Sequence, residues 1–378
     1  MMIHVVRPGD TIYSVARAYG VSPAGIINAT LPPDPGHLVV GQTLLIPTPP
    51  PANLPAAHIN AYIEPRGTEA DAAMVREVAA GLTYVAVFSY EVKADGSFKA
   101  PKDDIVVREA RRLGVAPLLT ITNFEAGKFS SEIARAVIRD QAVQRRVIDQ
   151  LMNLMRTKQY RGVNVDFEYL FPEDRESYNQ FLRNLVARAR PEGFLVSTAL
   201  APKTSAAQKG LLYEAHDYAA HGQIVDFSIL MTYEYGWSGG PPMAVAPPFQ
   251  IRKVLQFAVS VMPRNKIMMG LPLYGYDWTL PYVKGGRWAK RVSPQQAYTL
   301  AYQRHAAVQY DIRQQSPFFN YWVDGTQHVV WFEDARSMQQ KFNLMKEFGL
   351  RGGSYWVLGS SFPQNWSLLR NTFRIVKI

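Results

Sequence analysis

The stretch from Tyr160 to Tyr169 reads YRGVNVDFEY, and it decides how the rest of the chain is interpreted. Its polar residues Asn164, Asp166 and Glu168 alternate with apolar ones, and successive side chains of a strand point to opposite faces. The three polar side chains therefore share one face. Burying two carboxylates beside an amide is costly unless function requires it, so the pattern favours an acidic functional site over a solvated strand end.

Seven other apolar stretches have the length of strands, and amphipathic helical segments such as 70–80, 131–157 and 174–190 separate them. The eight predicted strands are residues 59–63, 84–89, 117–122, 162–168, 195–200, 225–233, 267–273 and 353–358. Buried strands that alternate with helices indicate a parallel sheet. Eight such units predict an α/β fold, a closed (β/α)8 TIM barrel whose active site lies at the strand C-termini. The long connection of about residues 279–333, rich in Trp and Tyr, predicts a small α+β insertion subdomain that walls one side of a cleft.

The proline-rich segment 49–56 predicts an extended linker between a small domain, residues 1–48, and the barrel, residues 57–378. Within the small domain, short strands flank two helices in a βααβ order. Its sequence from Val5 to Ile12, and again from Gly41 to Pro47, resembles a LysM module. The resemblance implies binding of N-acetylglucosamine polymers over two loops. The implied glycan-binding residues are Gly9, Asp10, Thr11, Ile12 and Asn28.

The segment from Gly162 to Glu168 is similar to the strand-four signature of glycoside hydrolase family 18, the chitinase-like barrels. Three later segments, 231–234, 270–275 and 352–356, are similar to the motifs of that family's sixth, seventh and eighth strands. The likeness covers nearly everything after the linker. It implies retaining hydrolysis in which the substrate's own acetamide is the nucleophile, so that neither a cofactor nor a metal is expected.

The resemblance also implies roles for individual residues. Glu168 would be the general acid/base, Asp166 would accept from the acetamido N–H, and Tyr233 would donate to its carbonyl. Trp356 would form the floor of the subsite that holds the reacting sugar. Asn164, where the family usually has aspartate, can still hydrogen-bond Asp166 but cannot share a proton with it, and it is counted with the catalytic residues. Nearby side chains are expected to contact substrate as well: Glu234, Asn123, Trp237, Trp278 and Tyr274. For Asn123, capping of a loop is an equal alternative.

Asn164 and Glu234 stand where the family usually has aspartate, and so does Arg161. These departures, together with the LysM module, resemble the branch of the family known as spore-cortex-lytic N-acetylglucosaminidases. That branch implies cleavage of β-1,4 bonds after N-acetylglucosamine in peptidoglycan, by a protein of the spore or cell wall. Without a basic and apolar leader at the N-terminus, we expect synthesis in the mother cell without an export signal.

The formal charge of +10 suggests affinity for an anionic polymer such as the cell wall, and a solvated surface without a partner is about equally compatible with it. The absence of cysteine excludes disulfides and thiolate metal sites. We expect a peptidoglycan-binding monomer with neither nucleic acid nor membrane insertion.

Two other motifs match known functional patterns only in part. The segment from Gly236 to Gly240 fits a serine-hydrolase elbow, but prolines follow where a helix should begin, which favours a substrate-lining loop. His216 and His221, with Glu214 and Asp217, carry metal-ligand chemistry at a spacing that matches no zinc helix, which favours a hydrated helix face.

Three alternatives stay open. A chitinase or chito-oligosaccharide hydrolase would share every catalytic residue. A lectin on the same barrel would bind glycan without cutting it, although the presence of both Asp166 and Glu168 counts against this. A structural spore-coat protein would adhere through the LysM module alone, and its adhesion would survive loss of Glu168.

Overall fold

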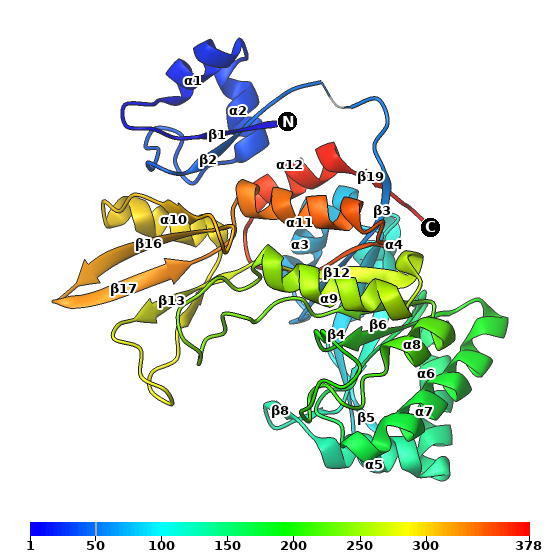
Figure 1. The fold of residues 1–378 in the computed structure, drawn as a ribbon. Coiled ribbons are helices and arrows are strands. Elements are labelled where there is room, and N and C mark those ends of the chain that lie inside the picture. Colours follow the sequence, from blue (N-terminus) through cyan, green and yellow to red (C-terminus); the bar gives the residue numbers. More distant parts are fainter. Residues whose placement is uncertain (50) are drawn as a thin grey trace.

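The computed structural model describes residues 1–49 and 51–378, and it shows a closed parallel barrel (Figure 1). Its eight strands are β3 (Ala56–Ile63), β4 (Tyr84–Val92), β6 (Ala116–Thr122), β9 (Gly162–Asp166), β10 (Leu195–Leu200), β11 (Phe227–Leu230), β12 (Ile267–Pro272) and β18 (Gly352–Trp356). They are neighbours in that order, and β18 pairs with β3 to close the ring. The predicted TIM barrel and its eight strands are confirmed.

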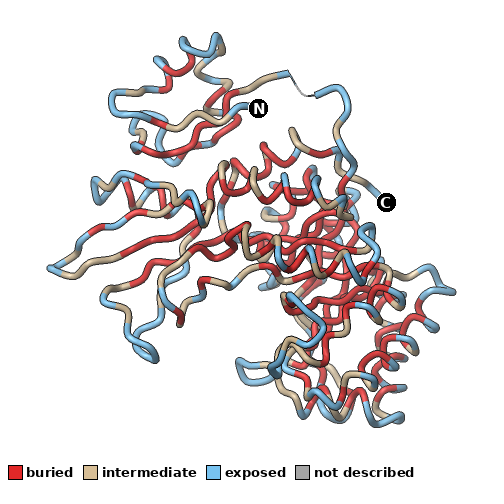
Figure 2. The backbone as a smooth tube through the Cα atoms, in the orientation of Figure 1, coloured by how far each residue is buried: buried red, intermediate tan, exposed pale blue. Residues whose placement is uncertain are grey.

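Helices surround the barrel because each carries one apolar face that the strands bury (Figure 2). They are α3 (Glu69–Val78), α4 (Asp104–Arg112), α5 (Ser131–Arg139), α6 (Gln141–Lys158), α7 (Arg175–Ala189), α8 (Tyr218–Ile224), α9 (Pro248–Val261), α11 (Ala335–Glu347) and α12 (Pro363–Thr372). Single-turn helices lie at Ala79–Gly81, Pro172–Asp174, Arg190–Glu192 and Arg264–Lys266. Short strands β5 (Phe98–Lys99), β7 (Phe124–Glu125), β8 (Lys128–Phe129) and β19 (Arg374–Ile375) complete this part.

Three predicted elements have different bounds in the structure. The helix expected over 131–157 is two helices, because Asp140 ends α5 and accepts hydrogen bonds from the first N–H groups of α6. The strands expected over 162–168 and 225–233 end earlier, at Asp166 and Leu230. The functional residues that follow these strands therefore stand beyond the sheet's hydrogen-bond ladder.

The insertion after β12 is a five-stranded antiparallel sheet with one helix. Its elements are β13 (Gly275–Thr279), β14 (Lys290–Val292), α10 (Pro294–Gln303), β15 (Gln309–Asp311), β16 (Ser316–Val323) and β17 (Thr326–Trp331). The expected α+β subdomain is present, and its first strand begins slightly before residue 279.

The N-terminal module has the predicted βααβ order, with β1 (Met2–Val5) antiparallel to β2 (Thr43–Ile46) and α1 (Ile12–Tyr19) and α2 (Pro23–Thr30) between them. Thr11 and Ser22 cap the two helices, as small hydroxyl residues favour. The linker prediction 49–56 includes Pro50, which lies outside the described residues, and Ala56 already belongs to β3.

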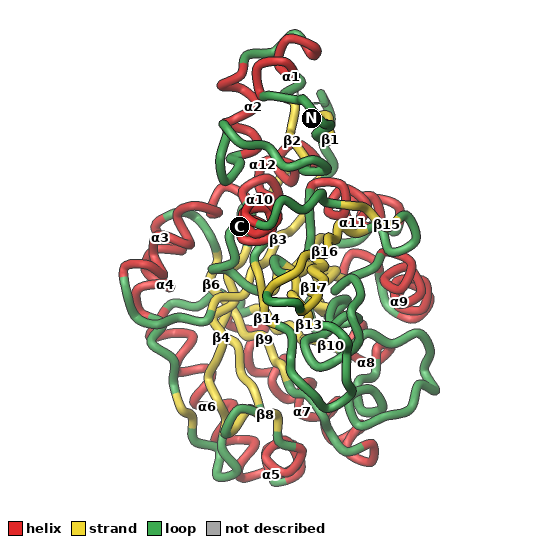
Figure 3. The backbone as a smooth tube through the Cα atoms, turned by 90° about the vertical axis from the view of Figure 1, so that its left-hand side faces the viewer, coloured by secondary structure: helices red, strands yellow, loops and turns green. Residues whose placement is uncertain are grey.

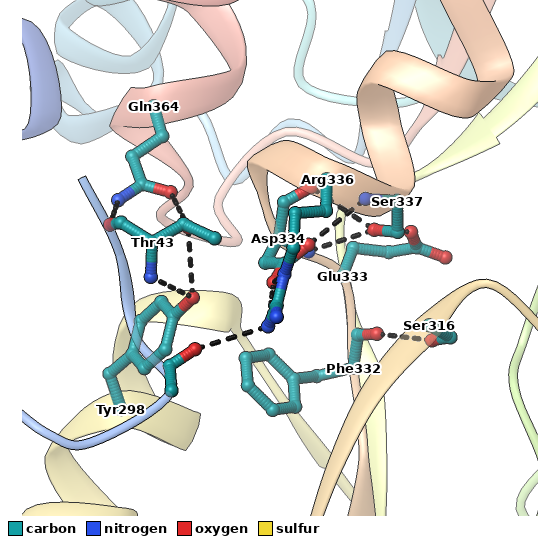
Figure 4. A network of polar contacts seen from close by, with 10 residues as sticks. Thr43, Tyr298, Ser316, Phe332, Glu333, Asp334, Arg336, Ser337 and Gln364 are labelled. Atoms are coloured by element: carbon teal, nitrogen blue, oxygen red, sulfur yellow. Dashed lines mark hydrogen bonds and ion pairs between the residues drawn. The ribbon is translucent and has the colours of Figure 1, made fainter. Parts of the chain in front are cut away.

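The module is docked against the barrel rather than merely tethered to it (Figure 3). Thr43 of β2 donates a 2.9 Å hydrogen bond to the Gln364 side chain of α12, and its backbone N–H lies 3.2 Å from the Tyr298 hydroxyl of α10 (Figure 4). Arg336 of α11 donates to the carbonyl of Gly41 at 3.1 Å. These bonds are largely buried, so the interface is part of the folded core and not a loose surface contact.

Within residues 1–49 and 51–378, no helix is long and apolar enough to cross a membrane.

Candidate active site

A cleft of about 760 Å³ opens at the C-terminal ends of the barrel strands. Asp166 ends β9 and Glu168 follows it, Tyr233 follows β11, and Trp356 ends β18. Strand C-termini are where TIM barrels carry their active sites, because the loops that follow can vary without disturbing the barrel. The structure thus brings these four predicted site residues into one cavity, together with Glu234 and Trp237.

The pKa values of the Asp166 and Glu168 carboxyls are both raised. Burial raises the pKa of Asp166 to about 7, since a charged carboxylate loses its hydration there. The pKa of Glu168 is raised well above its usual range, first by burial and then by the nearby charge of Asp166. A carboxyl that stays protonated near neutral pH can act as a general acid.

Asn164 does not make the expected hydrogen bond to Asp166. Its Oδ1 accepts from the Tyr62 hydroxyl at 2.8 Å, and its Nδ2 donates to the Ser197 hydroxyl at 3.0 Å. Within the described part of the chain, Oδ1 of Asp166 has no hydrogen-bond partner. The expectation was wrong because the neighbouring strands supply better placed partners for the amide.

The cleft has an aromatic floor that the sequence only partly revealed. The predicted Trp356 packs edge-on against Tyr62 and Phe88, with ring centroids 5.3 and 4.9 Å apart. Tyr62 and Phe88 also line the cleft, and neither was anticipated. The available signal was the place of Tyr62 near the end of the first predicted strand, 59–63, and of Phe88 near the end of the second, 84–89.

Tyr233 and the loop after β11 form another side of the cleft. The pKa of the Tyr233 hydroxyl is raised well above its usual range by burial and by the charges of Asp166 and Glu168, so it keeps its proton as a donor. Glu234 and Trp237 also line the cleft. Glu234 has a left-handed backbone (φ 63°), and its Oε1 accepts from the hydroxyls of Tyr274 and Tyr276.

Three expected substrate contacts lie elsewhere. Tyr274 is buried and donates its hydroxyl to Glu234, while Trp278 is 2% exposed and donates its indole N–H to the carbonyl of Gly240. Asn123 is fully buried next to Glu168. Its amide oxygen accepts from the backbone N–H of Glu168, and its amide nitrogen donates to the carbonyl of the same residue. Asn123 was predicted either to contact substrate or to cap a loop, and its hydrogen bonds in the structure are those of a residue that caps a loop.

The insertion contacts residues that line the cleft but does not form the expected wall. Trp288 of the insertion packs edge-on against Trp237, with ring centroids 5.8 Å apart. The residues that line the cleft come from the barrel strands and their loops. The segment 236–240 is one of these loops, and no helix begins there.

The expected hydrated face at His216 and His221 was also wrong, because both imidazoles are completely buried. Burial lowers the pKa of His216 to about 4 and that of His221 to about 3, so both rings are neutral at ordinary pH. Across the residues that the structure covers, no three His, Cys, Asp or Glu side chains gather as a metal ion requires.

In the N-terminal module, Gly9, Thr11 and Asn28 are exposed. Asp10 is half-buried and accepts from the backbone N–H of Arg7 at 2.7 Å and from His4 at 2.9 Å. Ile12 is 3% exposed and packs in the module's core, so only its backbone can face a ligand.

Comparison with known proteins agrees with this geometry. The model of the glycosyl hydrolases family 18 matches residues 118–360, and that of the LysM domain matches residues 4–47. The cortical fragment-lytic enzyme of Bacillus subtilis (strain 168) is 43% identical, with 100% of this chain and 99% of that protein covered.

Solved structures are similar as well. The crystal structure of the Bacillus megaterium QM B1551 spore cortex-lytic enzyme SleL superposes with a TM-score of 0.96 at 40% identity, covering 100% of this chain and 99% of that one. A chitinase from Chromobacterium violaceum ATCC 12472 superposes with a TM-score of 0.75 at 26% identity, covering 84% and 98%. The barrel, the acidic pair at the end of β9 and these matches together establish that the chain is a glycosidase of the glycosyl hydrolases family 18, carrying an N-terminal LysM domain.

Proposed function

We propose that this enzyme hydrolyses β-1,4 bonds after N-acetylglucosamine in peptidoglycan, with the spore cortex as its substrate. The observation that carries the proposal is the buried pair Asp166 and Glu168, both with raised pKa values, in the cleft of a chain that matches a cortical fragment-lytic enzyme over its whole length. Retention of both carboxyls argues against a lectin that only binds glycan.

In the proposed reaction, the acetamide oxygen of the substrate attacks the anomeric carbon while Glu168 transfers its proton to the leaving glycosidic oxygen. An oxazolinium ion forms, and Asp166 stabilises it by accepting from the acetamido N–H. Water then opens this ion as Glu168 takes the water's proton, which restores the enzyme and retains the anomeric configuration.

The remaining cleft residues would hold the substrate. Tyr233, a protonated donor beside the two carboxyls, would donate to the acetamide carbonyl. Trp356 would stack under the reacting sugar, with Tyr62 and Phe88 shaping the same floor. Glu234 and Trp237 would contact the flanking sugars.

The LysM domain would bind the same polymer. The exposed Gly9, Thr11 and Asn28, with Asp10 and the backbone at Ile12, would form its glycan-binding loops. The formal charge of +10 suits an anionic wall, and we infer action at the spore as a monomer.

The test is to incubate the enzyme and its Glu168→Gln variant with decoated spore cortex, vegetative peptidoglycan and chitin, and to identify released fragments by mass spectrometry. Glu132→Gln, at an exposed position of α5, is the matched control. Cortex muropeptides with a reducing N-acetylglucosamine end, released by the enzyme and the control but not by Glu168→Gln, would support the proposal.

A second candidate function is chitin hydrolysis, which the structural likeness to the Chromobacterium violaceum chitinase favours. Release of chito-oligosaccharides alone would replace the cortex assignment with that one. Binding without any product would overturn catalysis, and adhesion that Glu168→Gln leaves intact would then indicate a structural coat protein.

A further inference from the structure

The end of β9 is held by two buried side chains after its ladder stops. The strand pairs with β6 up to Asp166 and with β10 up to Val165. The next residues, Phe167 and Glu168, have no ladder partner, yet Glu168 must keep its carboxyl in the cleft. The chain turns away immediately afterwards at Tyr169, which has a left-handed backbone (φ 55°).

On one side, the imidazole of His216 joins the residues that directly follow β9 and β10. Its Nδ1 lies 2.9 Å from the backbone N–H of Ala201, which can only donate, so Nδ1 is the unprotonated acceptor. Its Nε2 lies 2.9 Å from the carbonyl of Phe167, which can only accept, so Nε2 carries the proton. The two partners therefore fix both the tautomer and the orientation of the ring.

On the other side, Asn123 holds the same peptide from the end of β6. Its Oδ1 accepts from the N–H of Glu168 at 3.0 Å, and its Nδ2 donates to the carbonyl of Glu168 at 2.8 Å. The Phe167 carbonyl and the Glu168 N–H belong to one planar peptide unit. His216 therefore hydrogen-bonds the oxygen of this peptide unit, and Asn123 hydrogen-bonds its nitrogen.

We propose that His216 is a positioning residue of the catalytic site, which holds the peptide unit between Phe167 and Glu168 so that the carboxyls of Asp166 and Glu168 both face the substrate. This assignment rests on the proposed roles of those two carboxyls. His216 itself is completely buried and does not line the cleft, so it acts through the backbone and not by touching substrate.

Loss of this bond would let the peptide unit rotate and carry the Glu168 carboxyl with it. Displacement of a catalytic group by about 1 Å lowers the rate by about 10²-fold, because the reacting atoms leave their aligned geometry. Substrate binding by the aromatic floor and by Trp237 would stay, since these residues come from other strands. The expected signature is a fall in kcat with little change in KM.

The chain offers a matched control in His221. It is the same residue type, fully buried in the same connection, but it bonds the Thr198 hydroxyl at 3.1 Å and makes no hydrogen bond to the backbone around Glu168. Its Nε2 has no hydrogen-bond partner in the part of the chain that is described. Replacing either ring with phenylalanine removes one buried imidazole, and only one of the two replacements frees the Phe167 carbonyl.

The experiment compares His216→Phe, His216→Gln and His221→Phe with the wild type on a defined peptidoglycan tetrasaccharide, with Glu168→Gln as the inactive reference. We expect His216→Phe to lower kcat by about 10- to 100-fold with KM within about twofold. We expect His221→Phe to keep wild-type kinetics. His216→Gln, whose amide can still donate to the carbonyl and accept from the Ala201 N–H, should recover part of the loss.

Equal kcat values for the His216 and His221 variants, while Glu168→Gln is inactive, would overturn the positioning role and leave the proposed function intact. An active Glu168→Gln enzyme would instead overturn the catalytic assignment itself. If His216→Phe fails to fold, as judged by near-UV circular dichroism, the pair His216→Gln and His221→Gln decides the question by the same comparison of kcat and KM.

Discussion

The hydroxyl of Tyr62, at the end of the first barrel strand, donates a 2.8 Å hydrogen bond to Oδ1 of Asn164 in the fourth. The same amide donates to Ser197 of the fifth strand at 3.0 Å. Three strands are thereby joined next to the catalytic carboxyls, and Oδ1 of Asp166 is left without a hydrogen-bond partner among the described residues.

Tyr62→Phe should destabilise the protein by about 1–3 kcal/mol, because Asn164 keeps a buried acceptor without its donor. Urea unfolding measures the change. Tyr178→Phe is the control, since the Tyr178 hydroxyl is buried and makes no hydrogen bond within residues 1–49 and 51–378. If both variants lose the same free energy of unfolding, the Tyr62–Asn164 bond contributes nothing specific.

Asp166→Asn should move the alkaline limb of the pH profile of kcat/KM to lower pH. The charge of Asp166 helps to raise the pKa of Glu168, so its removal lowers that pKa and the acid loses its proton earlier. The rate should also fall by about 10²-fold, because a neutral amide stabilises the oxazolinium ion less than a carboxylate does. An alkaline limb that stays in place or moves upward contradicts the coupling between the two groups.

The same substitution should raise stability at neutral pH while it lowers activity. The pKa of Asp166 is raised from 3.8 to about 7 in the folded state, so the folded protein binds this proton more tightly than the unfolded chain does. The stability that this proton provides is full below about pH 4 and is lost as the pH rises through about 7. An asparagine side chain does not titrate, so the Asp166→Asn variant lacks this pH dependence of stability.

Between pH 4 and pH 8, the wild type should therefore lose on the order of 3 kcal/mol in its free energy of unfolding relative to the Asp166→Asn variant. Denaturant titrations at both pH values test this. Parallel pH dependence in the two proteins would mean that Asp166 titrates normally in the folded state.

Gly41→Ala should break the contact between the LysM domain and the insertion. A Cβ at Gly41 would lie 1.8 Å from the carbonyl oxygen of Val308, and its φ of +86° is already unfavourable for alanine. We expect a loss of more than about 2 kcal/mol in the free energy of unfolding and a larger radius of gyration in solution scattering.

Gly9→Ala separates the two causes, because Gly9 has nearly the same φ of +84° and nothing within 4 Å of its Cβ position. It should cost only the backbone strain of about 1 kcal/mol and leave the radius of gyration unchanged. Identical effects of the two substitutions would show that the docked arrangement does not persist in solution.

Much of this protein can be predicted from sequence alone. Alternation of polar and apolar residues places Asn164, Asp166 and Glu168 on one face, and the repeated strand and helix pattern leads to the closed barrel. These features are local or periodic, and a short stretch of chain therefore contains the whole signal. The same holds for the βααβ module, whose helices begin at their own capping residues.

Only the tertiary structure decided which side chains meet. Tyr62 and Asn164 are 102 positions apart, and His216 reaches a carbonyl 49 positions away. Trp278 and Tyr274 are buried instead of facing substrate, and Thr43 joins the LysM domain to a helix 321 positions further on. Hydrogen-bond partners and burial depend on how distant strands and helices pack together, and no local pattern of residue types contains that information.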